Sequence, residues 1–142
     1  MSIWFHHVTI EDLNKLSAGT MVEHLGIIYK EIGEDSIIAT MPVDHRTHQP
    51  DGLLHGGASA TLAETLGSVA ANLCIDRTKK FCVGLEINAN HVKALRTGWV
   101  SGITRPVHLG HSTQIWEIRI VDEQNALVCI ARLTMAVLPK KE

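Results

Sequence analysis

Residues 48–75 read HQPDGLLHGGASATLAETLGSVAANLCI, and this stretch decides how the chain folds. At about 100° per residue, its apolar side chains fall at spacings of three and four residues and form one broad stripe, made by Ala58, Leu62, Leu66, Val69 and Leu73. The pattern predicts one long helix over about residues 57–74. Between Asp51 and Asp76 this stretch contains a single charged residue, Glu64, although charged residues make up 20% of the chain.

Runs rich in β-branched residues lie on both sides of the predicted helix. Two runs precede it and are separated by turn-forming residues 33–36, which predicts a hairpin. A short helix over residues 9–16, with Thr9 as its N-cap, is expected near the N-terminus. The six predicted strands cover residues 25–32, 36–43, 81–92, 99–107, 112–121 and 127–138.

The pattern within the strands predicts how the sheet packs. Val83, Leu85, Ile87 and Ala89 alternate with small or polar residues, so we expect these four side chains on one buried face. The last run is apolar on both faces and is expected to be a central strand. The order of the elements predicts an α+β fold, in which one antiparallel sheet packs against one long helix.

The composition excludes several classes of protein. The 142 residues are 45% hydrophobic and carry a formal net charge of −2, which predicts a single domain over residues 1–142 and argues against a nucleic-acid-binding surface. Glu64 and Asp76 interrupt the longest apolar segment, and the N-terminus lacks the basic and apolar regions of a secretory signal. Three well-separated cysteines in apolar surroundings are typical of reduced thiols. We therefore expect a soluble cytoplasmic protein without membrane or nucleic-acid partners.

The nine histidines do not form a metal-binding motif. The pairs His6 and His7, and His45 and His48, lack the HExxH or Cys/His spacing that is typical of zinc sites. We expect no metal site in this chain.

Glu64 lies on the face of the predicted helix opposite the apolar stripe. A solvated face would carry lysine, arginine or glutamine, but the rest of this face carries only small side chains: Ala60, Thr61, Gly67, Ser68 and Ala71. We therefore expect another part of the fold, or a second subunit, to cover it. Burying an unpaired carboxylate costs several kcal/mol, which favours a functional Glu64, with Ser68 within side-chain reach four residues later. The alternative is a solvent-exposed glutamate on a modestly polar face.

The start of the helix combines two glycines with polar neighbours. Free backbone N–H groups and the positive end of the helix dipole favour a developing negative oxygen there, and Gly56 and Gly57 allow a ligand to approach the backbone. Gln49 and His55 lie just upstream. The sequence therefore favours an oxyanion site at the mouth of the same helix that carries Glu64. For the glycines alone, the alternative is a tight turn into the helix.

The segment MPVDHRTHQPDGLLHGGASATLAETLGSVA, residues 41–70, resembles the signature region of the hotdog-fold acyl-CoA thioesterases, in the branch of the phenylacetate-pathway and 4-hydroxybenzoyl-CoA thioesterases. HLGI, VGLEINANHV, PVHLG and DEQNALVCIARLTMAVL are also similar, so the resemblance covers nearly the whole chain. Within this branch, the sequence is most similar to the 1,4-dihydroxy-2-naphthoyl-CoA thioesterases of menaquinone biosynthesis. The resemblance implies an antiparallel sheet wrapped around a long helix. It also implies homodimers that usually pair as tetramers, with active sites at the subunit interface.

The resemblance further implies roles for individual residues. Glu64 corresponds to the catalytic carboxylate, which acts as a nucleophile on the thioester carbonyl or as the base that activates water. The backbone N–H of Gly56 would bind the developing oxyanion, and Gln49 and His55 would position the thioester and water. Ser68 would orient the water or assist the departing thiolate. No cofactor is implied, because coenzyme A is part of the substrate.

Two further segments correspond to residues that hold coenzyme A in this family. Lys93 is the expected phosphate contact, and Arg96 is a weaker one. Some relatives carry an arginine just after the second glycine-containing loop, where this chain departs from the family with His111 and Ser112. The expected coenzyme A contacts are Gly84, His91, Val92, Lys93, Ala94, His108, Leu109, Gly110, His111, Ser112 and Thr113.

Two other functions compete with hydrolysis. A hotdog hydratase or dehydratase would act on enoyl-thioesters, but such enzymes pair a histidine with an acidic residue on different elements, and no matching pair is found here. A non-catalytic acyl-CoA-binding subunit would be the natural interpretation if Glu64 were missing. The acyl group is expected to lie among apolar residues that suit an aromatic ring as well as a medium chain: Leu53, Leu54, Val69 and Leu73.

Overall fold

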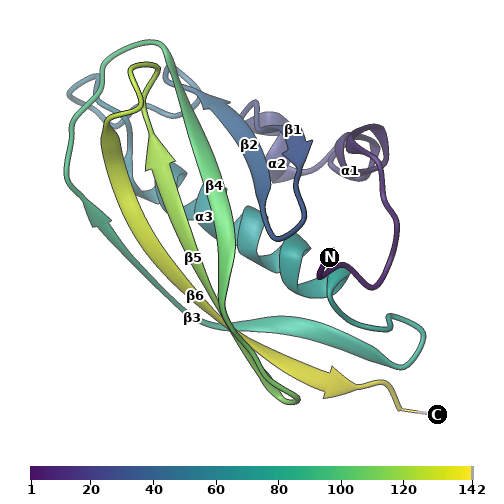
Figure 1. Ribbon diagram of the computed structural model, residues 1–142. Helices are drawn as coiled ribbons and strands as arrows, with labels where there is room; N and C mark the ends of the chain where they lie inside the picture. The colour runs from purple at the N-terminus through teal and green to yellow at the C-terminus, as the bar shows by residue number, and fades with distance from the viewer. Residues whose placement is uncertain (142) are drawn as a thin grey trace.

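The computed structural model describes residues 1–141 and shows a six-stranded antiparallel sheet that curves around one long helix (Figure 1). The strands follow the order β1-β2-β4-β5-β6-β3, so β6, the expected central strand, is paired on both sides. The predicted α+β architecture is confirmed, with each strand within three residues of its expected bounds. The elements are α1 (Ile10–Leu16), α2 (Met21–His24), β1 (Ile28–Ile32), β2 (Ile37–Pro42), α3 (Gly56–Leu73), β3 (Lys80–His91), β4 (Trp99–Leu109), β5 (Thr113–Val121) and β6 (Leu127–Pro139).

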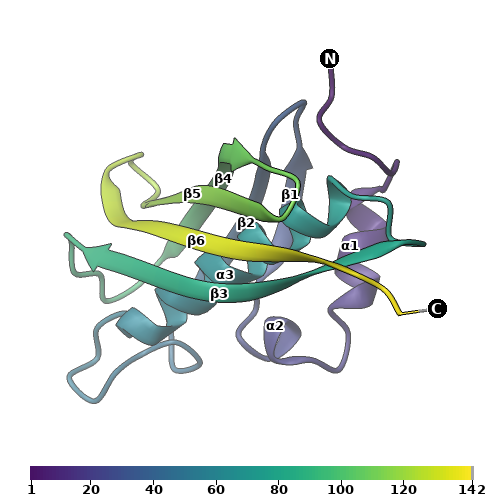
Figure 2. The ribbon, with the colours of Figure 1, turned by 90° about the horizontal axis from the view of Figure 1, so that it is seen from below.

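The helix α3 lies in the concave face of the sheet and forms the centre of the core (Figures 1 and 2). Leu62 and Leu66 are fully buried and pack on β4. A Cβ atom on Gly102 would lie only 2.6 Å from Leu66 Cδ1, so helix and strand approach closely at this glycine. Five strands, β2 to β6, contact α3, so most of the sheet packs around this one helix.

Two small residues of α3 face its own sheet rather than the opposite side. A Cβ atom on Gly67 would lie 2.6 Å from Leu133 Cδ2 of β6, and the Ala71 carbonyl accepts a hydrogen bond from the Cys82 thiol of β3 (3.6 Å). The prediction that Gly67 and Ala71 lie on the face opposite the sheet was wrong. The curved sheet covers more of the helix surface than the stripe of large apolar side chains indicates. The residues of that face that remain half-buried are Ala60, Thr61 and Ser68.

Replacing Gly67 by alanine is expected to destabilise the protein, although alanine is favoured over glycine in a helix by about 1 kcal/mol. The added methyl group overlaps Leu133, which is fully buried, and overpacking of this kind costs about 1–3 kcal/mol. Denaturant unfolding of the variant and the wild type measures the difference in the free energy of unfolding. A gain in stability would show that α3 does not pack this closely on β6.

The strand β3 contains a β-bulge that changes which side chains face α3. Its register with β6 shifts after Gly84, and Leu85 is the extra residue. Val83 and Leu85 are 39% and 63% exposed, whereas Ile87 and Ala89 pack against the core. The prediction of one buried face for all four was wrong, because a bulge reverses the alternation without disturbing the sequence pattern. β3 is also an edge strand, with β6 on one side and no strand on the other within residues 1–141.

The N-terminal segment forms a wall beside the end of α3. α1 begins after its expected cap, Thr9, while the one-turn helix α2 was not predicted. The Phe5 N–H donates a hydrogen bond to the Leu73 carbonyl (2.7 Å), which fixes the first residues of the chain against the C-terminal end of α3. Trp4 stacks on Trp116, with ring centroids 6.3 Å apart.

Candidate active site

Glu64 stands on the exposed face of α3. Its carboxylate lies beside β3, where a Cβ atom on Gly84 would be 3.0 Å from Glu64 Oε1, so glycine at this position leaves the carboxylate its space. The expectation of a partly buried carboxylate is wrong for a single protomer, because no segment within residues 1–141 covers this face. A second subunit would be needed to bury it.

The N-terminal end of α3 gathers three of the predicted residues. His55 is the N-cap, and its Nδ1 accepts a hydrogen bond from the Gly57 N–H (2.8 Å), so that the proton of a neutral ring sits on Nε2. The Gly56 N–H has no acceptor among residues 1–141 and is available to an incoming oxygen. The ring of His91, at the end of β3, lies against the same turn, with Nε2 2.9 Å from the place of a Cβ atom on Gly56.

Gln49 lies in the turn that leads to this helix. Its side-chain oxygen accepts a hydrogen bond from the Asp51 N–H, and its backbone N–H donates to the Leu53 carbonyl (2.8 Å). The turn is tied to the segment after β3, since His48 Nε2 is bonded to the Arg96 carbonyl (2.7 Å) and Arg96 Nη1 donates to the Asp51 carbonyl (3.0 Å). Arg96, the weaker candidate for a phosphate contact, therefore holds a loop in place.

Gly56 and Glu64 do not face a common site within one protomer. They are eight residues apart on α3, which is about 12 Å along the axis at about 1.5 Å per residue. A reacting carbonyl must lie about 3 Å from both its hydrogen-bond donor and its attacking group. A thioester therefore cannot be held at the mouth of the same helix that supplies the carboxylate, which corrects the simplest interpretation of the sequence.

Ser68 is one turn beyond Glu64 but is not hydrogen-bonded to it. Its hydroxyl donates instead to Met135 Sδ of β6, at 3.9 Å. The spacing of four residues was a sound reason to place the two side chains on one face, but β6 offers Ser68 another partner. Ser68 thus marks the beginning of a cavity rather than a partner of the carboxylate.

The two expected coenzyme A segments lie near opposite ends of α3, which is about 27 Å long for its 18 residues. Residues 91–94 comprise the last residue of β3 and the three that follow it, and His91 lies beside the start of the helix. Residues 108–113 form the turn of the β4–β5 hairpin. Gly110 and His111 line a cavity together with Cys74 and Asp76, which lie just past the end of the helix. The structure does not bring the two segments together within one protomer.

Lys93, the expected phosphate contact, takes part in an ion pair. Its ammonium group contacts the Asp122 carboxylate, which also accepts hydrogen bonds from the backbone N–H groups of Gln124 and Ala126 (both 2.9 Å). The hydrogen bond from Lys93 is the main cause that holds the pKa of Asp122 below its usual value. The Lys93 side chain is still 43% exposed, so its charge remains accessible from solvent.

Replacing Asp122 by asparagine is expected to lower stability near neutral pH, by an amount that shrinks in acid. Because the pKa of Asp122 is lower in the folded than in the unfolded chain, its carboxylate stabilises the fold above the unfolded pKa of about 3.9. This contribution is lost as the pH falls through the folded pKa. Denaturant unfolding of both proteins, in steps from about pH 7 to about pH 2, measures the difference. A difference that does not change with pH would contradict the pairing of Asp122 with Lys93.

The other reactive side chains offer no alternative centre. Within residues 1–141, no group of three or more histidine, cysteine or acidic side chains is placed to hold a metal ion. No helix in this part of the chain is both long and apolar enough to cross a membrane. The cysteines are free thiols, and burial raises the pKa of Cys74 to about 12, so this thiol is not a nucleophile near neutral pH.

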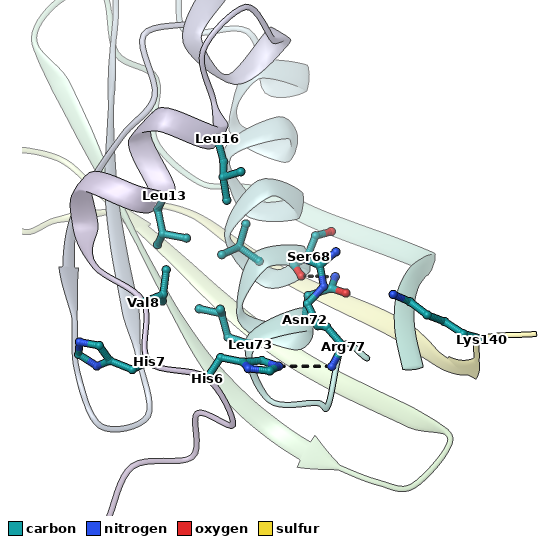
Figure 3. A pocket seen from close by; sticks show the side chains of 11 residues that line it. His6, His7, Val8, Leu13, Leu16, Ser68, Asn72, Leu73, Arg77 and Lys140 are labelled. Atoms are coloured by element: carbon teal, nitrogen blue, oxygen red, sulfur yellow. Dashed lines mark hydrogen bonds between the residues drawn. The ribbon is translucent and has the colours of Figure 1, made fainter. Parts of the chain in front are cut away.

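A cavity of about 490 Å³ lies between the N-terminal segment and the C-terminal half of α3 (Figure 3). Val69 and Leu73, two of the four residues expected around the acyl group, line it, whereas the other two do not. Sequence reasoning missed the rest of the lining, which comes from residues 6–16, from Asn72 and Arg77, and from Lys140. No local pattern marks these residues, because three distant segments meet only in the folded chain.

Residues 51–129, more than half of the chain, match the family model described as the Thioesterase superfamily. The chain belongs to this superfamily. The 1,4-dihydroxy-2-naphthoyl-CoA hydrolase of Escherichia coli (strain K12) is 54% identical over 136 residues, which cover 96% of this chain and 99% of that protein. The proofreading thioesterase EntH of Cronobacter sakazakii is 57% identical over 136 residues, which cover 96% of this chain and 98% of that protein.

The solved structures agree with the assignment to the thioesterase superfamily. A crystal structure of a mutant of thioesterase PA1618 from Pseudomonas aeruginosa matches this fold with a TM-score of 0.96 and 48% sequence identity, covering 98% of this chain and all of that one. The sheet wrapped around α3 is therefore the hotdog fold, as predicted. As a member of the thioesterase superfamily, the chain is a thioester hydrolase, and the predicted class of enzyme is confirmed.

Proposed function

We propose that this thioesterase hydrolyses aromatic or other bulky acyl-CoA thioesters to the free acid and coenzyme A, in the cytoplasm. The observation that carries the proposal is Glu64. It is the only charged side chain of α3, it is exposed beside the space left by Gly84, and it lies one turn from the cavity that begins at Ser68. A carboxylate in this position can act on a thioester carbonyl whose acyl group enters the cavity.

The active site is proposed to form between two protomers of a homodimer, and two dimers to pair as a tetramer. Three features support this: Gly56 and Glu64 are too far apart in one chain, no segment within residues 1–141 covers the Glu64 face of α3, and no strand in this part of the chain pairs with the outer edge of the 12-residue β3. A long exposed edge strand is a template for pairing with another chain. A two-fold pairing of β3 edges would run the two α3 helices antiparallel, so that the start of one approaches the middle of the other.

In this arrangement the Gly56 N–H of one protomer donates to the thioester carbonyl oxygen, while Glu64 of the other protomer faces the carbonyl carbon. Glu64 attacks the carbon directly, or removes a proton from the water that attacks it. The Gly56 N–H and the positive end of the helix dipole stabilise the oxyanion that forms. The carbon–sulfur bond then breaks and coenzyme A leaves as a thiolate. Water hydrolyses the anhydride if Glu64 was the nucleophile.

The acyl group is proposed to be aromatic because of the cavity and the relatives. A volume of about 490 Å³ falls within the range of small-molecule sites, about 300–1,000 Å³, and Val69 and Leu73 give it an apolar floor. The name of the E. coli relative specifies 1,4-dihydroxy-2-naphthoyl-CoA. We propose the same thioester as the substrate of this chain, and hence a role in menaquinone biosynthesis. No cofactor is needed, because the thiolate of coenzyme A is already a good leaving group.

Release of coenzyme A, followed with a thiol reagent, tests this function. The panel contains 1,4-dihydroxy-2-naphthoyl-CoA or a stable analogue as competitor, 4-hydroxybenzoyl-CoA, benzoyl-CoA, a medium-chain acyl-CoA and acetyl-CoA. We expect a higher kcat/KM for the aromatic thioesters than for acetyl-CoA, because only bulky groups fill the cavity. No turnover of any member by a folded oligomer would contradict acyl-CoA hydrolysis, and a preference for acetyl-CoA would contradict the proposed acyl group.

A further inference from the structure

The cavity beside α3 combines apolar walls with a few polar side chains (Figure 3). Val69 and Leu73 of α3, facing Leu13 and Val8 of the N-terminal segment, supply the apolar part. Polar side chains are set among them: Ser68 and Asn72 on α3, and Arg77 in the turn after the helix. An acyl group that enters from the side of Glu64 and Ser68 would therefore lie between apolar walls, with Asn72 and Arg77 at the side away from the thioester.

The side chain of Asn72 is held in one orientation by two hydrogen bonds. Its Nδ2 donates to the Ser68 carbonyl (2.9 Å), and its Oδ1 accepts from the Cys82 N–H of β3 (3.2 Å). A carbonyl needs a donor and an N–H needs an acceptor, so these partners also settle which end of the amide is nitrogen. The amide oxygen thus has a partner, while the second N–H of Nδ2 has none within residues 1–141. Asn72, which lines the cavity, can therefore donate one further hydrogen bond.

Among residues 1–141, the lining contains two charged side chains, Arg77 and Lys140, and both are basic. The rings of His6 and His7 also line the cavity. The Arg77 N–H donates to His6 Nε2 (3.3 Å), which ties the N-terminal segment to the turn after α3 and leaves the guanidinium group exposed at the rim (Figure 3). The free donor of Asn72 and the positive charges favour a ligand that brings oxygen atoms with lone pairs.

We propose that Asn72 and Arg77 are specificity-determining residues that recognise an oxygen substituent on the far side of an aromatic acyl group. The inference rests on the proposed acyl-CoA hydrolysis and adds what the substrate must carry. Asn72 lies eight residues beyond Glu64, about 12 Å along the helix, and helical side chains lean back toward the N-terminus. An aromatic ring attached to the reacting carbonyl thus directs a ring hydroxyl, on the side away from the thioester, toward the second N–H of Asn72. Arg77 adds a favourable positive charge at the rim.

The test compares two thioesters of nearly equal size, 4-hydroxybenzoyl-CoA and 4-methylbenzoyl-CoA, which differ in whether the ring substituent can accept a hydrogen bond. For each protein, the kcat/KM for 4-hydroxybenzoyl-CoA is divided by the kcat/KM for 4-methylbenzoyl-CoA. Effects of a substitution on the chemical step are shared by both substrates and cancel in this ratio. Asn72→Leu keeps the volume and removes the donor, and we expect it to lower the ratio by about threefold to tenfold, the effect of one hydrogen bond. Arg77→Gln, at an exposed position that retains its backbone N–H, is expected to lower the ratio by about twofold. Lys30→Gln removes an exposed charge on β1, outside the cavity, and should leave the ratio unchanged.

The outcomes separate this inference from the proposed function. If the wild type hydrolyses neither thioester, acyl-CoA hydrolysis of this class is excluded and the inference is excluded with it. If the wild type hydrolyses both, but the ratio is the same in the wild type, Asn72→Leu and Arg77→Gln, hydrolysis stands and the recognition of an oxygen substituent is wrong. Should Asn72→Leu fail to fold, an unchanged ratio in Arg77→Gln overturns the inference, and a lowered one supports it.

Discussion

Replacing Glu64 by alanine or glutamine is expected to lower kcat/KM for 4-hydroxybenzoyl-CoA by about 10²- to 10⁴-fold, the usual contribution of a positioned acid or base. Both substitutions remove the only ionisable group of α3, and glutamine does so with almost no change of shape. Because Glu64 is exposed in the protomer and makes no side-chain hydrogen bond among residues 1–141, neither change should disturb the core. Coenzyme A release by the purified variants measures the effect.

A matched control shows whether the decrease in kcat/KM is specific to the Glu64 carboxylate. Glu31→Gln removes the same charge at an exposed position of β1, and its activity should stay within about twofold of the wild type, as is usual for surface changes. Gel filtration of all the proteins verifies that the oligomer is retained. If Glu64→Ala and Glu64→Gln hydrolyse the thioester as fast as the wild type, Glu64 is neither nucleophile nor base. The carboxylate would then serve binding alone.

Two inactive variants are expected to restore activity to each other when they assemble together. In a site shared between protomers, Glu64 comes from one chain, and His55 and Gly56 come from the other. A chain with Glu64→Ala still supplies an intact His55, and a chain with His55→Gln still supplies an intact Glu64. After random assembly of equal amounts, about a quarter of the shared sites combine the two intact residues, so activity should rise to about a quarter of the wild-type value.

The complementation experiment distinguishes a site shared between two chains from a site within one chain. The two chains are denatured together and refolded as a mixture, and each is also refolded alone, where only residual activity is expected. His55→Gln is the suitable partner because a glutamine oxygen can still accept a hydrogen bond at the helix N-cap that His55 Nδ1 now occupies. If every site lay within a single chain, every chain in the mixture would carry one defect. Activity would then remain at the level of the separate variants.

Features that depend on local periodicity could be read from the sequence. The stripe at three- and four-residue spacing located α3 to within one residue at each end, and β-branched runs located all six strands, because both signals arise from which face of an element is buried. The bulge at Leu85 was not predictable in this way, since one extra residue leaves the composition of the strand unchanged. In the proposed dimer the environment of Glu64 depends on a second chain, and the lining of the cavity brings together His6 and Arg77, which are 71 positions apart. Contacts between chains, or between residues far apart in the sequence, produce no local pattern of residues from which they could be predicted.

The N-terminal segment has a consequence for how this enzyme can change. In the proposed mechanism the chemistry depends on Glu64 of α3, and half of the residues of this helix are buried in the core, where substitutions affect the whole fold. One wall of the cavity belongs instead to residues 6–16, which are joined to the end of α3 by the Phe5 and Arg77 backbone hydrogen bonds and by side-chain packing. If the cavity holds the acyl group as proposed, substitutions in that wall would alter which acyl groups fit while Glu64 and its surroundings remain as they are. Part of the choice of substrate would then be separate from the breaking of the thioester bond, and new specificities could arise without passing through an inactive enzyme.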